Sequence, residues 1–269
     1  MQVKSIEFLT KNPVFTLEDF KGLLANRGTT GPRSAESLLT YYLKAGHVVR
    51  VKRGLYAAVP RGSDARKFVP DPFLLAAKMA SDAVLIHHTA LEWHGKAYSV
   101  FNHFTYQTNA FPHAVSYLGW KFLPVKVPAP LRKEGKPGFS VLTVERNGMD
   151  LQVASLERTL VDVLDRPVYS GSWEEIWRSL GSIEFFDLRQ VVEYVCLLGK
   201  ALTAARVGFF LEQNREALMV EEKHLEEIQK LCPGQPGYFD WRQKNGKLNK
   251  KWNLIIPEDV LNKSWEEIL

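Results

Sequence analysis

The chain has 269 residues, of which 45% are hydrophobic and 24% are charged, and these fractions are typical of a folded globular protein. No apolar run approaches the roughly 18 to 20 residues that span a bilayer. The two cysteines, Cys196 and Cys232, form neither a disulfide framework nor a metal-binding spacing. These features exclude membrane-spanning and disulfide-rich secreted classes, so we expect a cytoplasmic protein with no membrane partner.

The positive charge of the chain is concentrated at its N-terminus. The first 60 residues hold nine Lys or Arg side chains against four acidic ones, which leaves +5, the net charge of the whole chain. The rest of the chain is neutral. A basic region of this kind is the electrostatic feature expected of a nucleic-acid-binding domain.

Three helices are predicted before Gly46. The apolar residues of 3–9 recur with a helical period, and a second helix begins at Thr16, which is placed to form a capping box with Asp19. A third helix is predicted over 33–45, and Gly46 ends it.

A β-hairpin is predicted directly after these helices. The β-rich stretches 47–51 and 55–59 flank the basic turn 52–54. Three helices followed by a hairpin is the order of a winged helix-turn-helix. We therefore predict such a DNA-binding domain over 1–60 and, from its polar composition, a linker over 61–70.

The larger part of the chain, 71–269, predicts one mixed domain of helices and strands. Asp71 and Ser155 are good N-caps, as is the Ser-Gly-Ser stretch that ends at Ser172, and Asn147-Gly148 between alternating apolar residues predicts a tight hairpin. Further helices are predicted near 173–180, 187–199, 203–214 and 220–231. Because the repeating rhythm of a doubly wound sheet is missing, the predicted fold class is α+β, with an N-terminal winged helix-turn-helix.

One face of the third predicted helix carries short polar and basic side chains, which is the pattern that reads base edges in a major groove. The residues before the helix and in the hairpin turn are placed to contact phosphates or a minor groove. The predicted contacts with double-stranded DNA are Thr29, Thr30, Arg33, Ser34, Ser37, Tyr41, Lys44, Arg50, Lys52 and Arg53. A basic face that binds an acidic protein instead is an open alternative.

Motifs of enzymes are missing. His87, His88, His94 and His103 cluster in the sequence, yet no thiol pair or His-Glu-x-x-His spacing accompanies them, so structural roles are expected for them. The Glu-x-Lys of 221–223 resembles part of a nuclease signature, but its helical surroundings predict a solvated helix face. We expect no enzymatic activity, metal or cofactor; a nuclease guided by the winged helix is the alternative.

Three short motifs follow one another along the chain. They are 52–60 (KRGLYAAVP), 86–95 (IHHTALEWHG) and 155–162 (SLERTLVD), the last followed by Asp165-Arg-Pro. In this order they resemble the AbiE-type antitoxin family, whose members are transcriptional regulators of type IV toxin–antitoxin operons in phage defence by abortive infection.

This resemblance implies a protein of two domains. The winged helix would bind inverted repeats in its own promoter and repress transcription, and the C-terminal domain would neutralise a nucleotidyltransferase-like toxin without a stable complex. The resemblance places Lys52, Arg53 and Tyr56 in the wing, and Glu157 and Arg158 in a motif of the antitoxin domain. A plain transcriptional regulator without an antitoxin role is a second alternative. The resemblance gives no role to the basic segment 241–252.

Overall fold

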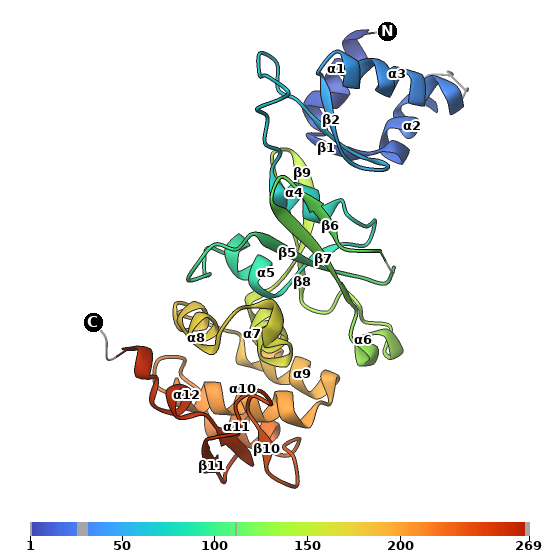
Figure 1. The fold of residues 1–269 in the computed structure, drawn as a ribbon. Helices are drawn as coiled ribbons and strands as arrows, with labels where there is room; N and C mark the ends of the chain where they lie inside the picture. Colours follow the sequence, from blue (N-terminus) through green and yellow to red (C-terminus); the bar gives the residue numbers. More distant parts are fainter. Residues whose placement is uncertain (1, 26–31, 111, 267–269) are drawn as a thin grey trace. The chain divides into compact units, whose positions relative to one another are not determined.

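A computed structural model describes residues 2–25, 32–110 and 112–266 (Figure 1). The chain forms two compact units, each built from three separate stretches. Unit 1 comprises Met1–Leu85, Asn102–Lys126 and Thr143–Val153, and unit 2 comprises Ile86–Phe101, Val127–Leu142 and Ala154–Leu269. Neither unit begins or ends within 61–70, where the sequence predicts a linker. Helices and three sheets are present, which confirms the expected combination of helices and strands.

The first part of unit 1 contains three helices and a three-stranded sheet. Its elements are α1 (Gln2–Lys11), β1 (Val14–Thr16), α2 (Leu17–Ala25), α3 (Pro32–Lys44), β2 (Val48–Lys52) and β3 (Leu55–Ala58). Strand β3 pairs antiparallel with both β1 and β2. The three helices and the hairpin agree with the sequence predictions. Strand β1 was not predicted, because three residues form a strand only by pairing with β3.

A capping box and an aromatic core hold these first elements together. The Thr16 hydroxyl accepts a hydrogen bond from the backbone N–H of Asp19 at 3.1 Å, and the Asp19 carboxylate accepts one from the backbone N–H of Thr16 at 2.9 Å. Phe15 and Phe20 are fully buried, and their ring centroids lie 5.9 Å apart. The core therefore fixes α2 and α3 against the small sheet.

The rest of unit 1 consists of α4 (Pro72–Ala77) and most of a six-stranded sheet. The strand order is β6-β7-β5-β4-β9-β8, with β4 (Val84–Leu85), β5 (His103–Thr108), β6 (Val115–Tyr117), β7 (Trp120–Lys126), β8 (Val141–Arg146) and β9 (Met149–Ala154). Strand β4 is antiparallel to β5 and parallel to β9. Asn147 and Gly148 join β8 to β9 with φ values of 52° and 77°, as the predicted hairpin requires.

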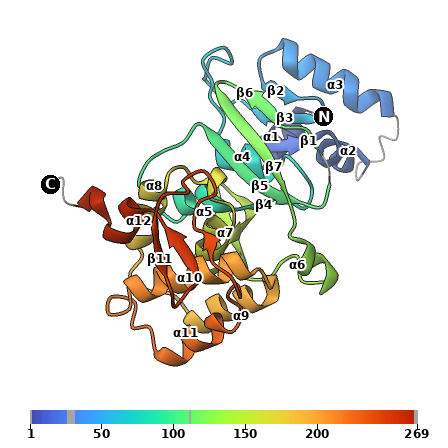
Figure 2. The same ribbon diagram turned by 60° about the horizontal axis from the view of Figure 1, so that its bottom comes forward.

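Unit 2 is mainly helical (Figure 2). Its helices are α5 (His87–Trp93), α6 (Ala129–Lys133), α7 (Leu156–Asp165), α8 (Trp173–Gly181), α9 (Leu188–Leu198), α10 (Ala201–Gln213), α11 (Glu222–Gln229) and α12 (Glu258–Asn262), with 3₁₀ turns at Pro167–Tyr169 and Ser264–Glu266. Helix α10 packs against α7, α9 and α11 around a common apolar core. Ser155 and Ser172 cap α7 and α8, as their positions in the sequence predict.

A second three-stranded sheet lies near the end of unit 2. Strand β12 (Leu254–Ile256) lies between β10 (Gly237–Tyr238) and β11 (Lys247–Asn249). The sequence did not predict this sheet, since its strands have two or three residues each and β10 pairs with β12 in parallel across a long connection. Among the helices described here, none combines the length and apolar character that crossing a membrane requires.

Candidate nucleic-acid interface

Helix α3 presents a polar stripe to solvent. Ser37, Tyr41 and Lys44 are exposed, and they follow one another at intervals of four and three residues, which places them on one side of the helix. On the other side Leu39 and Tyr42 are buried at 2% and 4% exposure. Because the buried side packs against the aromatic core, the outer stripe has a fixed orientation on residues 2–58.

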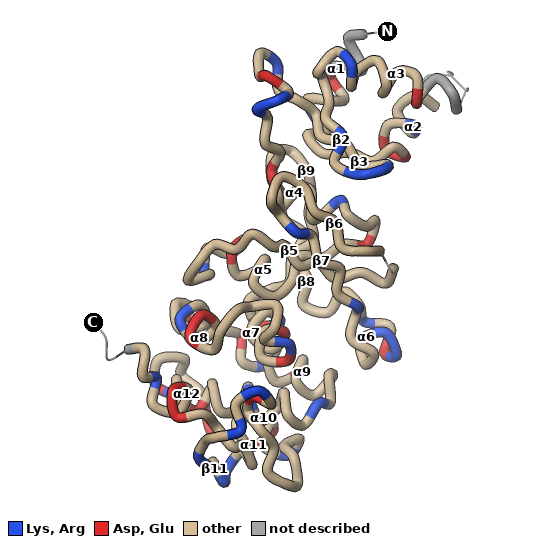
Figure 3. Tube along the Cα trace, viewed as in Figure 1, with Lys and Arg blue, Asp and Glu red and all other residues tan. Residues whose placement is uncertain are grey.

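The hairpin of β2 and β3 adds basic residues, and the charge-coloured trace is blue along part of this hairpin (Figure 3). Arg50 and Arg53 are exposed. Gly54 has a φ of 82°, so the tight turn after Arg53 requires a residue without a side chain. Because Arg50 and Arg53 are both exposed, their guanidinium groups are accessible to a polyanion.

Lys52 differs from the two arginines. Its Nζ donates a hydrogen bond to the backbone carbonyl of Met79 at 3.0 Å, and burial lowers the pKa of its amine below the usual range. The Arg50 Nε in turn donates to the Lys52 carbonyl at 3.4 Å. Lys52 thus braces the hairpin against the segment after α4, which the sequence pattern gave no reason to expect.

Four of the predicted contacts cannot be placed as side chains. Thr29 and Thr30 lie outside the described residues. Arg33 and Ser34 belong to the first turn of α3 as backbone, but their side chains are likewise not described. The described part of the predicted interface is therefore Ser37, Tyr41, Lys44, Arg50, Lys52 and Arg53.

A groove of about 1230 Å³ lies within unit 1 beside the hairpin. It is lined by cations, including Arg50, Arg53 and Lys78, and by acids, including Asp19. Lys78 and Asp19 form an ion pair at 3.3 Å. Burial opposes ionisation of Asp19, but the hydrogen bond from Thr16 and the charge of Lys78 outweigh it and lower the pKa of that carboxyl. Because the charges are of both signs, the groove is not a simple phosphate channel.

Arg158, one of the two residues of the third motif, is fully buried in unit 2. Its Nε donates to an Asp162 carboxylate oxygen at 3.2 Å, and its Nη1 donates to the backbone carbonyl of Phe139 at 2.8 Å. The Tyr194 hydroxyl donates to the other Asp162 oxygen at 2.6 Å. These bonds satisfy a buried ion pair, so Arg158 holds α7, α9 and the loop after α6 together.

Glu157, the other residue of that motif, is half-buried. Its carboxylate accepts a hydrogen bond from the backbone N–H of Asp187 at 3.2 Å, just before α9 begins. Both motif residues therefore make contacts inside unit 2. The sequence indicated the helix that carries them, but it gave no sign that the arginine is buried.

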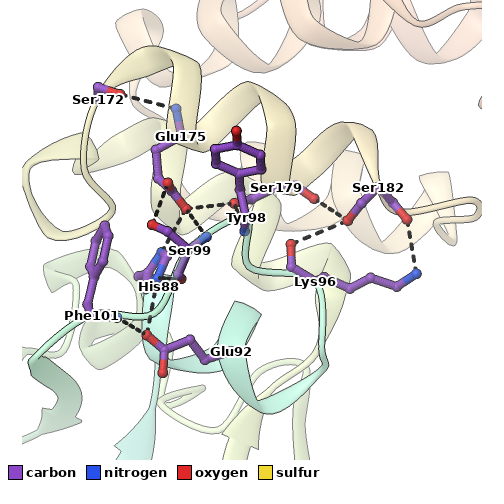
Figure 4. Close-up of polar contacts among 10 residues, drawn as sticks. All are labelled: His88, Glu92, Lys96, Tyr98, Ser99, Phe101, Ser172, Glu175, Ser179 and Ser182. Carbon is purple, nitrogen blue, oxygen red and sulfur yellow. Dashed lines mark hydrogen bonds and ion pairs between the residues drawn. The ribbon is translucent and has the colours of Figure 1, made fainter.

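The histidine-rich motif forms a second polar cluster (Figure 4). His88 is fully buried, its Nε2 lies 2.9 Å from the Ser99 carbonyl and 3.2 Å from Glu92, and its ring stacks on Phe101 at 3.6 Å. Glu175 on α8 accepts hydrogen bonds from the Ser99 N–H at 3.0 Å and the Ser99 hydroxyl at 2.7 Å. The cluster fixes the backbone of the loop that follows α5.

The other histidines of this region also have structural surroundings. His87 is buried and lies 4.9 Å from the ring of Tyr169, and the Nε2 of His94 lies 2.9 Å from the Ala154 carbonyl. His103 belongs to β5 of unit 1. Within the described ranges, no group of three or more His, Cys, Asp or Glu side chains is placed to hold a metal ion.

Comparison with known proteins gives a likeness of fold only. No protein-family model matches the chain, and no curated protein matches it. A solved structure, the crystal structure of RV2827C protein from Mycobacterium tuberculosis, is similar with a TM-score of 0.61 and 16% sequence identity. The similarity covers 98% of this chain and 93% of that chain. The two proteins therefore share a fold over nearly their whole lengths.

Proposed function

We propose that residues 2–58 are a winged helix-turn-helix that binds double-stranded DNA, and that the protein represses transcription from its own promoter. The observation that carries the proposal is the exposed stripe of Ser37, Tyr41 and Lys44 on α3, with Arg50 and Arg53 exposed on the adjoining hairpin. The order α1, β1, α2, α3, β2, β3 supports the winged-helix assignment, since α3 then occupies the position of the recognition helix.

The dimensions of α3 suit this role. From Ser37 to Lys44 the helix rises by about 10 Å, which matches about three stacked base pairs. Side chains of this length reach base edges when the helix lies in the major groove, whereas the hairpin arginines reach the phosphates beside it. Base contacts then provide the sequence preference and the arginines provide most of the salt-dependent affinity.

A mobility-shift titration with the DNA upstream of the coding region tests the proposal. We expect the double variant Arg50→Ala/Arg53→Ala to reduce the slope of log affinity against log salt by about two. We expect Tyr41→Ala to reduce discrimination between the operator and unrelated DNA by about tenfold. Lys223→Ala, which removes an exposed lysine of unit 2 paired with Glu221, is the matched control.

Equal binding by the wild type and the double arginine variant would contradict the hairpin assignment. The same samples, incubated with Mg²⁺ and supercoiled DNA, separate a repressor from a nuclease, because a repressor leaves the DNA intact. If two copies bind an inverted repeat, the titration is expected to give either two shifted bands, for one and two bound copies, or a single shifted band with both copies bound.

The wider part of the proposal is that the protein is an AbiE-like antitoxin against a nucleotidyltransferase-like toxin. The order of the three motifs supports it, and so does the packing of α5, which carries the second motif, against α7, which carries the third. Co-expression with the product of the neighbouring reading frame tests it. The chain and its Arg50→Ala/Arg53→Ala variant are both expected to restore growth; growth arrest despite expression of the chain would contradict the antitoxin role.

A further inference from the structure

The basic segment after β10 begins at a firmly anchored point of unit 2. The Arg206 guanidinium, buried on α10, donates from Nε and Nη2 to the carbonyl of Phe239 at 2.9 and 2.6 Å. The indole N–H of Trp173 donates to the carboxylate of Asp240 at 2.9 Å. The backbone just before Trp241 is therefore held by side chains of two helices, α10 and α8.

The segment ends at a second anchor, the indole of Trp252. This ring is fully buried and lies against Gly208 of α10, where any added side chain would overlap the ring atoms. Its N–H donates to Glu212 at 2.6 Å. Residues 241–251 are thus a surface segment fixed at both ends.

Trp241 contrasts with Trp252 because its side chain is 74% exposed. Because the backbone before and after it is held in place, this indole stays at the surface and does not pack into the core. Exposed aromatic groups on fixed backbone are common in binding surfaces, where the flat ring contributes a large contact area and loses little conformational freedom on binding.

Cations surround this exposed indole. Between Trp241 and Trp252 the chain has five basic residues and no acidic one: Arg242, Lys244, Lys247, Lys250 and Lys251. Arg242 pairs with Asp240, Lys247 with Glu258, and Lys251 with Glu212 and Glu222. Lys244 and Lys250 are exposed and, as far as the described residues go, form no ion pair. The blue stretches near β11 in Figure 3 mark this region.

An open hollow of about 770 Å³ lies along the same segment. It is lined by residues 242–246 on one side and by Pro257, Glu258 and Asp259 on the other. The amides of Gln243 and Asn245 contribute donors and acceptors, and the two carboxylates accept hydrogen bonds from amino groups. The hollow therefore offers groups for a sugar and for a base edge beside cations that suit a phosphate.

From this combination we infer that residues 241–251 bind single-stranded RNA. The face of a base is accessible to Trp241 only in a single strand, since a duplex stacks its bases internally. The lysines meet the phosphates, and Gln243 and Asn245, which line the hollow, offer their amides to a ribose 2′-hydroxyl. The carboxylate of Asp259, and that of Glu258 beside its partner Lys247, accept hydrogen bonds from exocyclic amino groups, so they favour bases such as cytosine over uracil, which has no amino group.

This inference does not depend on the proposed function, because the two sites share no residue. The test uses the full chain carrying Arg50→Ala/Arg53→Ala, which removes the proposed duplex contacts, and a labelled oligocytidine RNA of about twelve nucleotides. Anisotropy is expected to show binding as tight as that of the wild-type chain. If the arginine variant loses the RNA, the RNA contact lies in residues 2–58 and the inference is wrong.

Trp241→Ala is expected to weaken RNA binding about tenfold, whereas Trp241→Phe retains most of it. Phe185→Ala is the matched control, because Phe185 is also an exposed aromatic residue, at 65%, but is flanked by Glu184. Melting curves of all three variants are expected to match the wild type, since both side chains lie at the surface. Equal RNA affinity for Trp241→Ala and the wild type would overturn the inference.

Two further measurements test the phosphate contacts and the preference for RNA over DNA. Lys244→Ala/Lys250→Ala is expected to reduce the slope of log affinity against log salt by about 1.4, the contribution of two phosphate contacts on a single strand. Oligodeoxycytidine of the same length is expected to bind about threefold more weakly than the RNA. An unchanged salt slope, or DNA binding as tight as RNA binding, would overturn the assignment to RNA.

Discussion

Residues 2–58 and the helical core of unit 2 use the same charged residue types in opposite ways. Around α3 and the hairpin, Lys44, Arg50 and Arg53 lie at the surface. In unit 2, Arg158 and Arg206 are buried, and their guanidinium groups donate to a carboxylate or to backbone carbonyls. A motif arginine is therefore a contact residue or a part of the core depending on its surroundings, and only the structure separates the two.

The largest expected effect tests this contrast in unit 2. Arg158→Ala leaves the buried Asp162 carboxylate without its cation and the Phe139 carbonyl without a donor, so we expect a loss of about 3 to 5 kcal/mol in the free energy of unfolding. Urea unfolding followed by circular dichroism measures it. Arg50→Ala is the control and should change stability by less than about 0.5 kcal/mol. Equal stability of the two variants would remove the distinction between the regions.

Acid is expected to weaken unit 2 through His87. Burial lowers the pKa of this imidazole to about 3, and the charge of Arg166 adds to the effect. The unfolded chain, with an ordinary His pKa near 6.5, therefore binds the proton first. The contribution of neutral His87 to the free energy of unfolding is fully present above about pH 6.5 and is lost as the pH falls toward 3. At pH 4.5 the loss is about 2 to 3 kcal/mol.

His87→Asn provides the control for this pH dependence. Asparagine tolerates the positive φ of 52° at this position and has no ionisable group in the range. Urea midpoints at pH 7 and pH 4.5 should differ less in the variant than in the wild type. The same shift in both proteins would show that other groups account for the acid sensitivity.

The smallest effect concerns the first region. Thr16→Ala removes one half of the capping box of α2, and we expect a cost of about 1 kcal/mol confined to residues 2–58. Hydrogen exchange of the α2 amides, compared with that of the α9 amides, measures it. Thr40→Ala removes an exposed hydroxyl bonded only within its own helix, and it should leave exchange unchanged. Faster exchange in α9 would show that the two regions unfold together.

Local signals allowed much of the fold to be predicted. The caps at Thr16, Asp71, Ser155 and Ser172 act within three residues of themselves, and the Asn147-Gly148 turn needs only its own two dihedral angles. The exposed stripe on α3 follows from helical spacing in the same way. Such features can be read from sequence because their partners lie nearby in the chain.

The features that could not be predicted depend on distant partners. Strand β1 needs β3, and the sheet around β12 needs a parallel partner. The bond from Lys52 to the Met79 carbonyl and the burial of Arg158 depend on packing between elements that lie far apart in the sequence. Among the predicted DNA contacts whose side chains are described, Lys52 is the one whose surroundings differ most from the expected exposed position.

The pairing of β4 with β9 has a consequence for how the chain is made. Leu85 pairs with Val153, so the six-stranded sheet cannot be completed until the ribosome has synthesised β9. The sheet of residues 2–58 can form earlier, because β1, β2 and β3 lie close together in the sequence and leave the ribosome before β4. A nascent chain interrupted between these points would carry a finished N-terminal region joined to an open strand edge, which is a target for proteases and for aggregation.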